Sequence, residues 1–91
     1  MNIERSFGSE KIASLSRFPE GLHGTIVDVV AEPELHGRLM GMGLFVGTRF
    51  QLLRGGGDRG TTVGSLPFLL AIGETRVAMG REIAETILVE P

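Results

Sequence analysis

Short hydrophobic runs with the spacing of β-strands recur along the chain, and glycine or proline separates most of them. In "RFQLLR", Phe50 and Leu52 fall on one face of a strand, whereas Arg49 and Gln51 mark the other face as the solvated one. "PFLLAI" is continuously apolar, and together with "RVAM" it flanks a "GET" turn, which predicts a hairpin. The predicted strands are His23–Val30, Arg49–Arg54, Pro67–Ile72, Arg76–Met79 and Thr86–Glu90.

Between the first two strands the apolar spacing changes to that of a helix. Leu35, Leu39 and Met42 recur at i, i+4 and i+7 and so share one face. Pro33 suits the first helical turn, and Gly43 is well placed to end the helix in a left-handed conformation. The pattern predicts a helix that begins at Pro33 and ends at Met42, and "REIAE" predicts one further helical turn before the last strand.

This order of elements favours a mainly β fold. Five short strands with one helix do not suit a doubly wound sheet, which needs repeated crossover helices. They suit a small, highly curved barrel, since closure removes the edges that such apolar strands would expose. The helix is expected to pack across the barrel. The predicted core consists of Ile26, Leu35, Leu39, Phe50, Leu52, Leu70, Ile72, Val77, Ala84 and Ile87.

Composition limits the classes of function. The 91 residues suffice for one domain, and a domain of this size rarely builds a deep enzymatic cleft. The absence of cysteine fits a reducing, intracellular compartment, and no apolar run is long enough to span a bilayer. A net charge of −2 counts against nucleic acid as a partner. Residues 1–12 are polar without a sustained period and are interpreted as an N-terminal extension of a domain over residues 13–91.

Several stretches in order resemble the FeoA-type domain of bacterial ferrous iron uptake, which also forms the carboxyl-terminal barrel of iron-dependent repressors. The resemblance covers roughly residues 13 to 90. Met42 stands where the family commonly has leucine, and Met79 and Gly80 stand where leucine and arginine are commoner. The residues that carry the resemblance are Arg38, Leu39, Met42, Gly43, Leu44 and Gly47, and then Arg76, Val77, Ala78, Met79, Ala84 and Ile87.

The resemblance implies an SH3-like five-stranded barrel in the cytoplasm. It implies an accessory protein, not an enzyme, that acts with a membrane-embedded ferrous iron permease carrying a GTPase domain, at the inner face of the plasma membrane. The residues themselves also give no sign of catalysis. "GGGDRGTT" lacks the Gly-Lys-Ser/Thr ending of a phosphate-binding loop, and no serine, histidine and acid set stands out.

A metal site is one candidate for binding chemistry. Glu32, Glu34 and His36 lie within "EPELH", and oxygen and nitrogen ligands of this kind suit Fe(II), Mn(II) or Zn(II). The alternative is a solvated helix start, in which Glu34 complements the positive end of the helix and His36 faces solvent.

A protein-binding surface is the second candidate. Gly37 and Gly41 each lower the stability of the helix by roughly 1 kcal/mol relative to alanine. Either the helix packs so closely on the barrel that only glycine fits, or the surface formed by these two glycines contacts a partner. The outer side of the helix and the turn after it offer Arg38, Met40, Gly41 and Phe45 as contacts. Edge strands and the apolar "PFLLAI" run also predict self-association, most commonly as a symmetric dimer.

Two classes of function therefore remain. The first is a protein-interaction module that modulates the permease. The second is a metal- or peptide-sensing barrel related to the repressor domains, and stoichiometric binding of Fe(II) or Mn(II) distinguishes it from the first.

Overall fold

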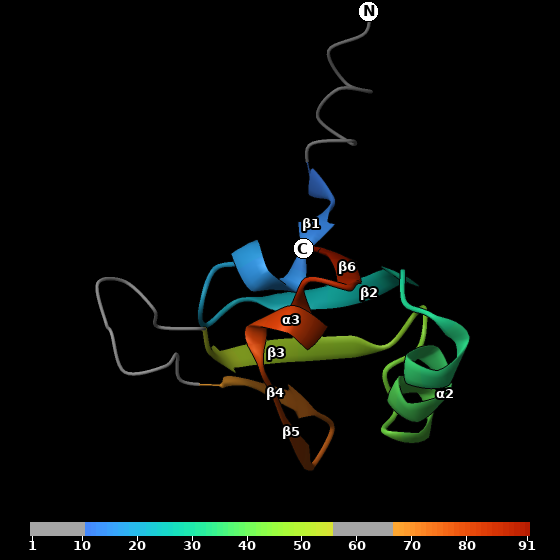
Figure 1. Ribbon diagram of the computed structural model, residues 1–91. Coiled ribbons are helices and arrows are strands. Elements are labelled where there is room, and N and C mark those ends of the chain that lie inside the picture. The colour runs from blue at the N-terminus through green and yellow to red at the C-terminus, as the bar shows by residue number, and fades with distance from the viewer. Residues whose placement is uncertain (1–10, 56–66) are drawn as a thin grey trace, which may run out of the picture.

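The computed structural model of the chain describes residues 11–55 and 67–91 (Figure 1). A single antiparallel sheet of six strands has the order β1-β6-β2-β3-β4-β5. The strands are β1 (Ala13–Ser14), β2 (His23–Val29), β3 (Arg49–Arg54), β4 (Phe68–Ile72), β5 (Thr75–Met79) and β6 (Ile87–Glu90). The helices are the short 3-10 helix η1 (Leu15–Arg17), α2 (Pro33–Gly41) and α3 (Arg81–Ala84). No helix in these two ranges combines the length and the apolar character needed to cross a bilayer.

The mainly β fold predicted from the sequence is confirmed, including α2 between the first two long strands and the helical turn before the last. The described residues hold one strand more than predicted, because β1 is too short to show alternation in the sequence. β1 pairs with β6, with Ala13 opposite Val89. The prediction that closure leaves no free edge is wrong for β5, which pairs only with β4 among the described residues.

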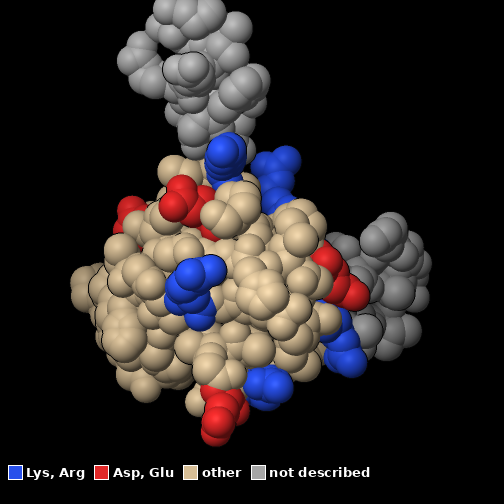
Figure 2. Space-filling view, turned by 180° about the vertical axis from the view of Figure 1, so that it is seen from behind, with Lys and Arg blue, Asp and Glu red and all other residues tan. Residues whose placement is uncertain are grey.

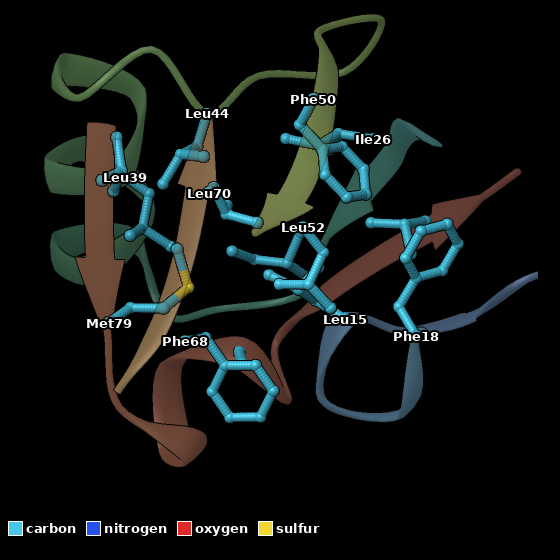
Figure 3. Close-up of a cluster of buried hydrophobic side chains, with 14 of the residues drawn as sticks. Leu15, Phe18, Ile26, Leu39, Leu44, Phe50, Leu52, Phe68, Leu70 and Met79 are labelled. Carbon is cyan, nitrogen blue, oxygen red and sulfur yellow. The ribbon is translucent and has the colours of Figure 1, made fainter. Parts of the chain in front are cut away.

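The hydrophobic core lies within the curve of the sheet (Figure 3). Phe50 and Leu52 of β3 are buried while Arg49 is exposed, so the predicted alternation of this strand is confirmed. Leu35 and Ile72, which were predicted to be core residues, are only partly buried and pack against its margin. The buried hydrophobic residues are Leu15, Phe18, Ile26, Val29, Leu39, Leu44, Phe50, Leu52, Phe68, Leu70, Val77, Met79, Ala84, Ile87 and Val89.

β2 approaches its neighbours closely at Gly24. This residue is buried and lies opposite Phe50 of β3, and the rings of Phe50 and Phe18 stand 5.3 Å apart between centroids, tilted by 58°. A Cβ atom on Gly24 would lie 2.8 Å from the Cζ of each ring and 2.8 Å from the carbonyl oxygen of Glu90. Only a hydrogen atom fits in this space.

A Schellman motif ends α2 and turns the chain into the core. The backbone N–H of Gly43 donates to the carbonyl of Met40, and the N–H of Leu44 donates to the carbonyl of Leu39, each at 3.0 Å. Gly43 has φ +92°, the left-handed conformation predicted for it. Leu39 and Leu44 are both buried in the same core, as expected of the apolar pair that accompanies this motif.

Met42 was predicted on the core face of α2 and is instead 44% exposed. The helix ends at Gly41, and Met42 has φ −93° and ψ 3°. Met42 therefore lies beyond the helix, and the helical spacing that would place it on the same face as Leu35 does not apply. Leu44 is the residue that is buried in the core instead.

Candidate protein interface

The four residues predicted to contact a partner lie close together in the chain, at the end of α2 and in the turn after it. Arg38 and Gly41 are exposed on α2, and Met40 is half-buried. Phe45 is 44% exposed in the turn that leads to β3. The structure thus keeps three of the four available at the surface and turns Met40 partly inward.

Two further apolar side chains are exposed beside them. Met42 is 44% exposed and Val46 is 61% exposed, and with Phe45 they form what we call the apolar turn surface. The backbone holds this turn firmly, because the N–H of Gly47 donates to the carbonyl of Ile26 at 2.7 Å and the N–H of Thr48 donates to that of Phe45 at 3.0 Å. An anchored backbone with exposed apolar side chains suits contact with another protein.

Sequence reasoning missed Met42 because the helical period assigned it to the core. It also passed over Val46, although an apolar residue between Phe45 and a glycine in a turn has little chance of reaching a core.

An open groove of about 570 Å³ separates the end of α2 from β5, and we call it the α2–β5 groove. Gly41, Met42 and Gly43 form one wall, and the β5 residues from Thr75 to Ala78 form the other. Figures 1 and 3 show α2 alongside β5 at this end of the sheet. Its volume falls within the roughly 300–1,000 Å³ typical of ligand clefts.

The glycines of α2 are not explained by close packing. A Cβ atom on Gly37 or Gly41 would meet no atom within 4 Å among the described neighbours. The expectation that α2 packs so closely that only hydrogen fits is therefore wrong. The close approach occurs at Gly24 instead, where β2 crosses the two phenyl rings.

The residues predicted to hold a metal ion lie at the start of α2. Glu32 is the N-cap residue, and its side chain makes no capping hydrogen bond. Glu34 is exposed in the first turn, and His36 is half-buried, not on the fully solvated side of the helix. Within residues 11–55 and 67–91, no three His, Asp or Glu side chains come together in a group that could hold a metal ion. The structure therefore assembles no ligand set from these residues, and metal binding by them stays a prediction.

The glycine-rich stretch "GGGDRGTT" lies outside the described residues except for Gly55. The N–H of Gly55 donates to Glu20 Oε1 at 2.9 Å, which ties the end of β3 to the loop before β2.

A smaller and more polar hollow of about 240 Å³ lies across β2, β3 and β4, with His23, Arg49 and Gln51 in its lining. The Nε2 of Gln51 donates to the carbonyl of Gly21 at 3.1 Å.

The charged side chains of the described residues lie at the surface. No polar or charged side chain is buried in the part of the chain that the structure describes. On the face seen in Figure 2, charged side chains lie singly or in small groups, and uncharged side chains cover most of the area between them. At the apolar turn surface and the α2–β5 groove, the available binding chemistry is apolar contact, with Arg38 and Arg76 as nearby charges.

Comparison with known families and structures points to one group of proteins. The model of the FeoA domain matches residues 13–91. No curated protein matches the chain. Three similar solved structures are all FeoA proteins, and one of them, from Stenotrophomonas maltophilia, is described as an SH3 domain protein and was solved in complex with zinc. The SH3-like fold expected from the resemblance is thereby confirmed.

The similarity to these structures is moderate in sequence and extends over most of the chain. An iron uptake regulatory protein (FeoA) is 24% identical with a TM-score of 0.72, and the match covers 87% of this chain and 96% of that one. FeoA from Chlorobium tepidum is 30% identical with a TM-score of 0.66, covering 85% and 68%. The Stenotrophomonas maltophilia protein is 24% identical with a TM-score of 0.65, covering 85% and 88%.

A manganese-dependent transcriptional repressor matches as well, and so does ScaR in structures with bound Zn²⁺ and with bound Cd²⁺. This chain covers 35–41% of their length at 21–23% identity, with TM-scores of 0.70 or 0.71. At this level of identity the likeness shows a shared fold.

Proposed function

This chain belongs to the FeoA family of ferrous iron transport, and from that premise we propose that it is an accessory protein that modulates a membrane ferrous iron permease by binding to it at the inner face of the membrane. The contact is made by the outer end of α2, the apolar turn surface and the α2–β5 groove. The GTPase domain of the permease is the proposed partner domain.

The observation that carries this proposal is the exposure of three large apolar side chains on one rigid turn. Met42, Phe45 and Val46 lie within five residues of one another, and backbone hydrogen bonds anchor the turn to β2. A core does not need these side chains, and their exposure to water is unfavourable unless a partner covers them. Arg38, exposed on the same end of α2, supplies a charge that orients the partner.

The test replaces the native chain in cells with a Met42→Asp, Phe45→Asp double variant and measures uptake of radiolabelled ferrous iron. Both side chains are exposed, so the fold should persist, and circular dichroism checks that it does. Leu22→Asp is the matched control, because Leu22 is 46% exposed in the loop before β2, away from the apolar turn surface. Uptake should fall to that of the deletion strain in the double variant and stay unchanged in the control. Full uptake with the folded double variant would refute this contact.

A second candidate function is metal sensing, and the zinc complex of the Stenotrophomonas maltophilia protein is the observation that favours it. In this chain Glu32, Glu34 and His36 are the candidate ligands. Isothermal titration calorimetry of the chain with Fe(II) and with Zn(II) under anaerobic conditions tests this function. Stoichiometric binding that Glu34→Gln and His36→Ala abolish supports it, and binding that persists in both variants excludes these ligands.

A further inference from the structure

We propose that the α2–β5 groove binds an extended peptide strand of the partner, which adds to the free edge of β5 and places an acidic side chain against Arg76. The proposal deepens the proposed function and rests on it, since it names the kind of segment by which an interaction partner is held.

The first argument is the free edge itself. β4 and β5 are joined by a two-residue turn in which Gly73 has φ +60°, and Ile72 lies opposite Thr75. The pair that closes such a turn is hydrogen-bonded, and hydrogen-bonded pairs alternate along an antiparallel ladder. Thr75 and Val77 therefore direct their backbone groups toward β4, and Arg76 and Ala78 direct theirs toward the groove.

These outward backbone groups have no partner strand among residues 11–55 and 67–91. In the ranges that the structure describes, β5 is the last strand of the sheet, and no backbone hydrogen bond links Arg76 or Ala78 to another element. Two N–H groups and two carbonyls thus lie in a row along the groove. Only an extended backbone presents donors and acceptors at the matching spacing, whereas a helix has already satisfied its own.

The second argument is the wall opposite the edge. The Schellman motif fixes Gly41, Met42 and Gly43 across from β5, and Met42 projects an exposed, flexible and apolar side chain beside the groove. Val77 is buried on the inner side of β5, so a strand residue opposite Val77 points toward the same apolar side. A hydrophobic side chain suits that position.

The third argument is charge. Arg76 is exposed, lines the groove and forms no ion pair with any residue in the two described ranges. Opposite charges directly across a strand pair stabilise it. Ala78, on the same outer side, leaves room for a small partner residue. Antiparallel pairing is slightly more stable than parallel pairing, so the peptide is expected to run antiparallel to β5. From its amino end it then has a small residue opposite Ala78, an apolar residue opposite Val77 and an acidic residue opposite Arg76.

The experiment uses the full chain, labelled with ¹⁵N, and the capped peptide acetyl-Thr-Thr-Ala-Val-Glu-Thr-Thr-amide. In this register its Ala and Glu residues hydrogen-bond to Ala78 and Arg76, and its Val directs its backbone groups away from β5. Three peptides are compared: the parent, one N-methylated at Glu and one N-methylated at Val. Strand addition predicts saturable binding of the parent and slowed hydrogen exchange at the amides of Arg76 and Ala78.

N-methylation at Glu should weaken binding about tenfold or more, because it removes one hydrogen bond and leaves a carbonyl unpaired, whereas N-methylation at Val should have little effect. A peptide with Lys in place of Glu should also bind about tenfold more weakly, and an Arg76→Glu variant should restore its binding. The variant Arg49→Glu, an exposed arginine outside the groove, should not.

Absence of binding, equal binding of both N-methylated peptides, or exchange protection away from β5 would overturn the proposal. Amide hydrogen exchange at Arg76 and Ala78 that slows as the concentration of the peptide-free chain rises would also overturn it, because a second copy of the chain would then be the occupant. The proposed function is tested separately, by iron uptake in the Met42→Asp, Phe45→Asp variant. If that variant loses uptake but the peptide does not bind β5, the partner contacts this surface without adding a strand.

Discussion

Replacing Gly24 with alanine should destabilise the fold through a single added methyl group. Its Cβ would lie 2.8 Å from two phenyl Cζ atoms and from the carbonyl oxygen of Glu90, distances that real Cβ atoms essentially never show. Phe18 and Phe50 are both buried, so their rings cannot swing into solvent, and the carbonyl belongs to β6, which is paired on both sides. Overpacking of this kind costs about 1–3 kcal/mol.

The backbone conformation of Gly24 adds nothing to that cost, because its φ lies outside the left-handed region. In a domain of 60–100 residues, 1 kcal/mol shifts the melting temperature by roughly 4–8 °C, so Gly24→Ala should melt at least about 4 °C below the native chain. The assay is thermal and urea denaturation followed by circular dichroism.

Gly37→Ala is the matched control, since the same methyl group there meets no atom within 4 Å. It should raise stability by up to about 1 kcal/mol, because alanine is the better helix former. An unchanged midpoint for Gly24→Ala, or equal shifts in the same direction for both variants, would refute the packing argument.

Three further outcomes are expected. Leu39→Ala should lower the free energy of unfolding by about 2–5 kcal/mol, as measured by urea denaturation, because it empties a buried position at the end of α2; an unchanged midpoint would remove Leu39 from the core. Gly43→Ala should cost about 1–2 kcal/mol in the same assay, because its φ of +92° strains any residue with a Cβ, and a neutral effect would contradict the Schellman geometry. Light scattering over a concentration series should detect a reversible dimer formed through helix contact, which leaves the edge of β5 free, and a constant mass of one chain would refute that prediction.

Much of the fold could be predicted because it is encoded locally. The alternation around Phe50 fixes which face of β3 is buried, and Gly43 is needed for the left-handed residue that ends α2. β1 could not be predicted, since two residues become a strand only when β6 is beside them. The role of Gly24 is equally remote from the local pattern, because Phe18, Phe50 and Glu90 come together there only after folding.

The candidate site was predictable only in part. The sequence predicts Arg38, Met40, Gly41 and Phe45 as surface residues, because none of them lies on the predicted core face of the helix or of a strand. Met42 was assigned inward because helical periodicity cannot show that the helix stops one residue earlier. The groove depends on β5 as an edge strand beside the end of α2, and that arrangement of segments far apart in the chain has no local signature.

The measurement that tests the central claim most directly is the affinity of the purified chain for the purified ferrous iron permease in nanodiscs, measured by biolayer interferometry. The native chain and Leu22→Asp should bind with equal affinity, and Met42→Asp, Phe45→Asp should lose most of its binding while keeping its fold. Binding of the folded double variant with native affinity would show that the permease does not contact the apolar turn surface and would contradict the account.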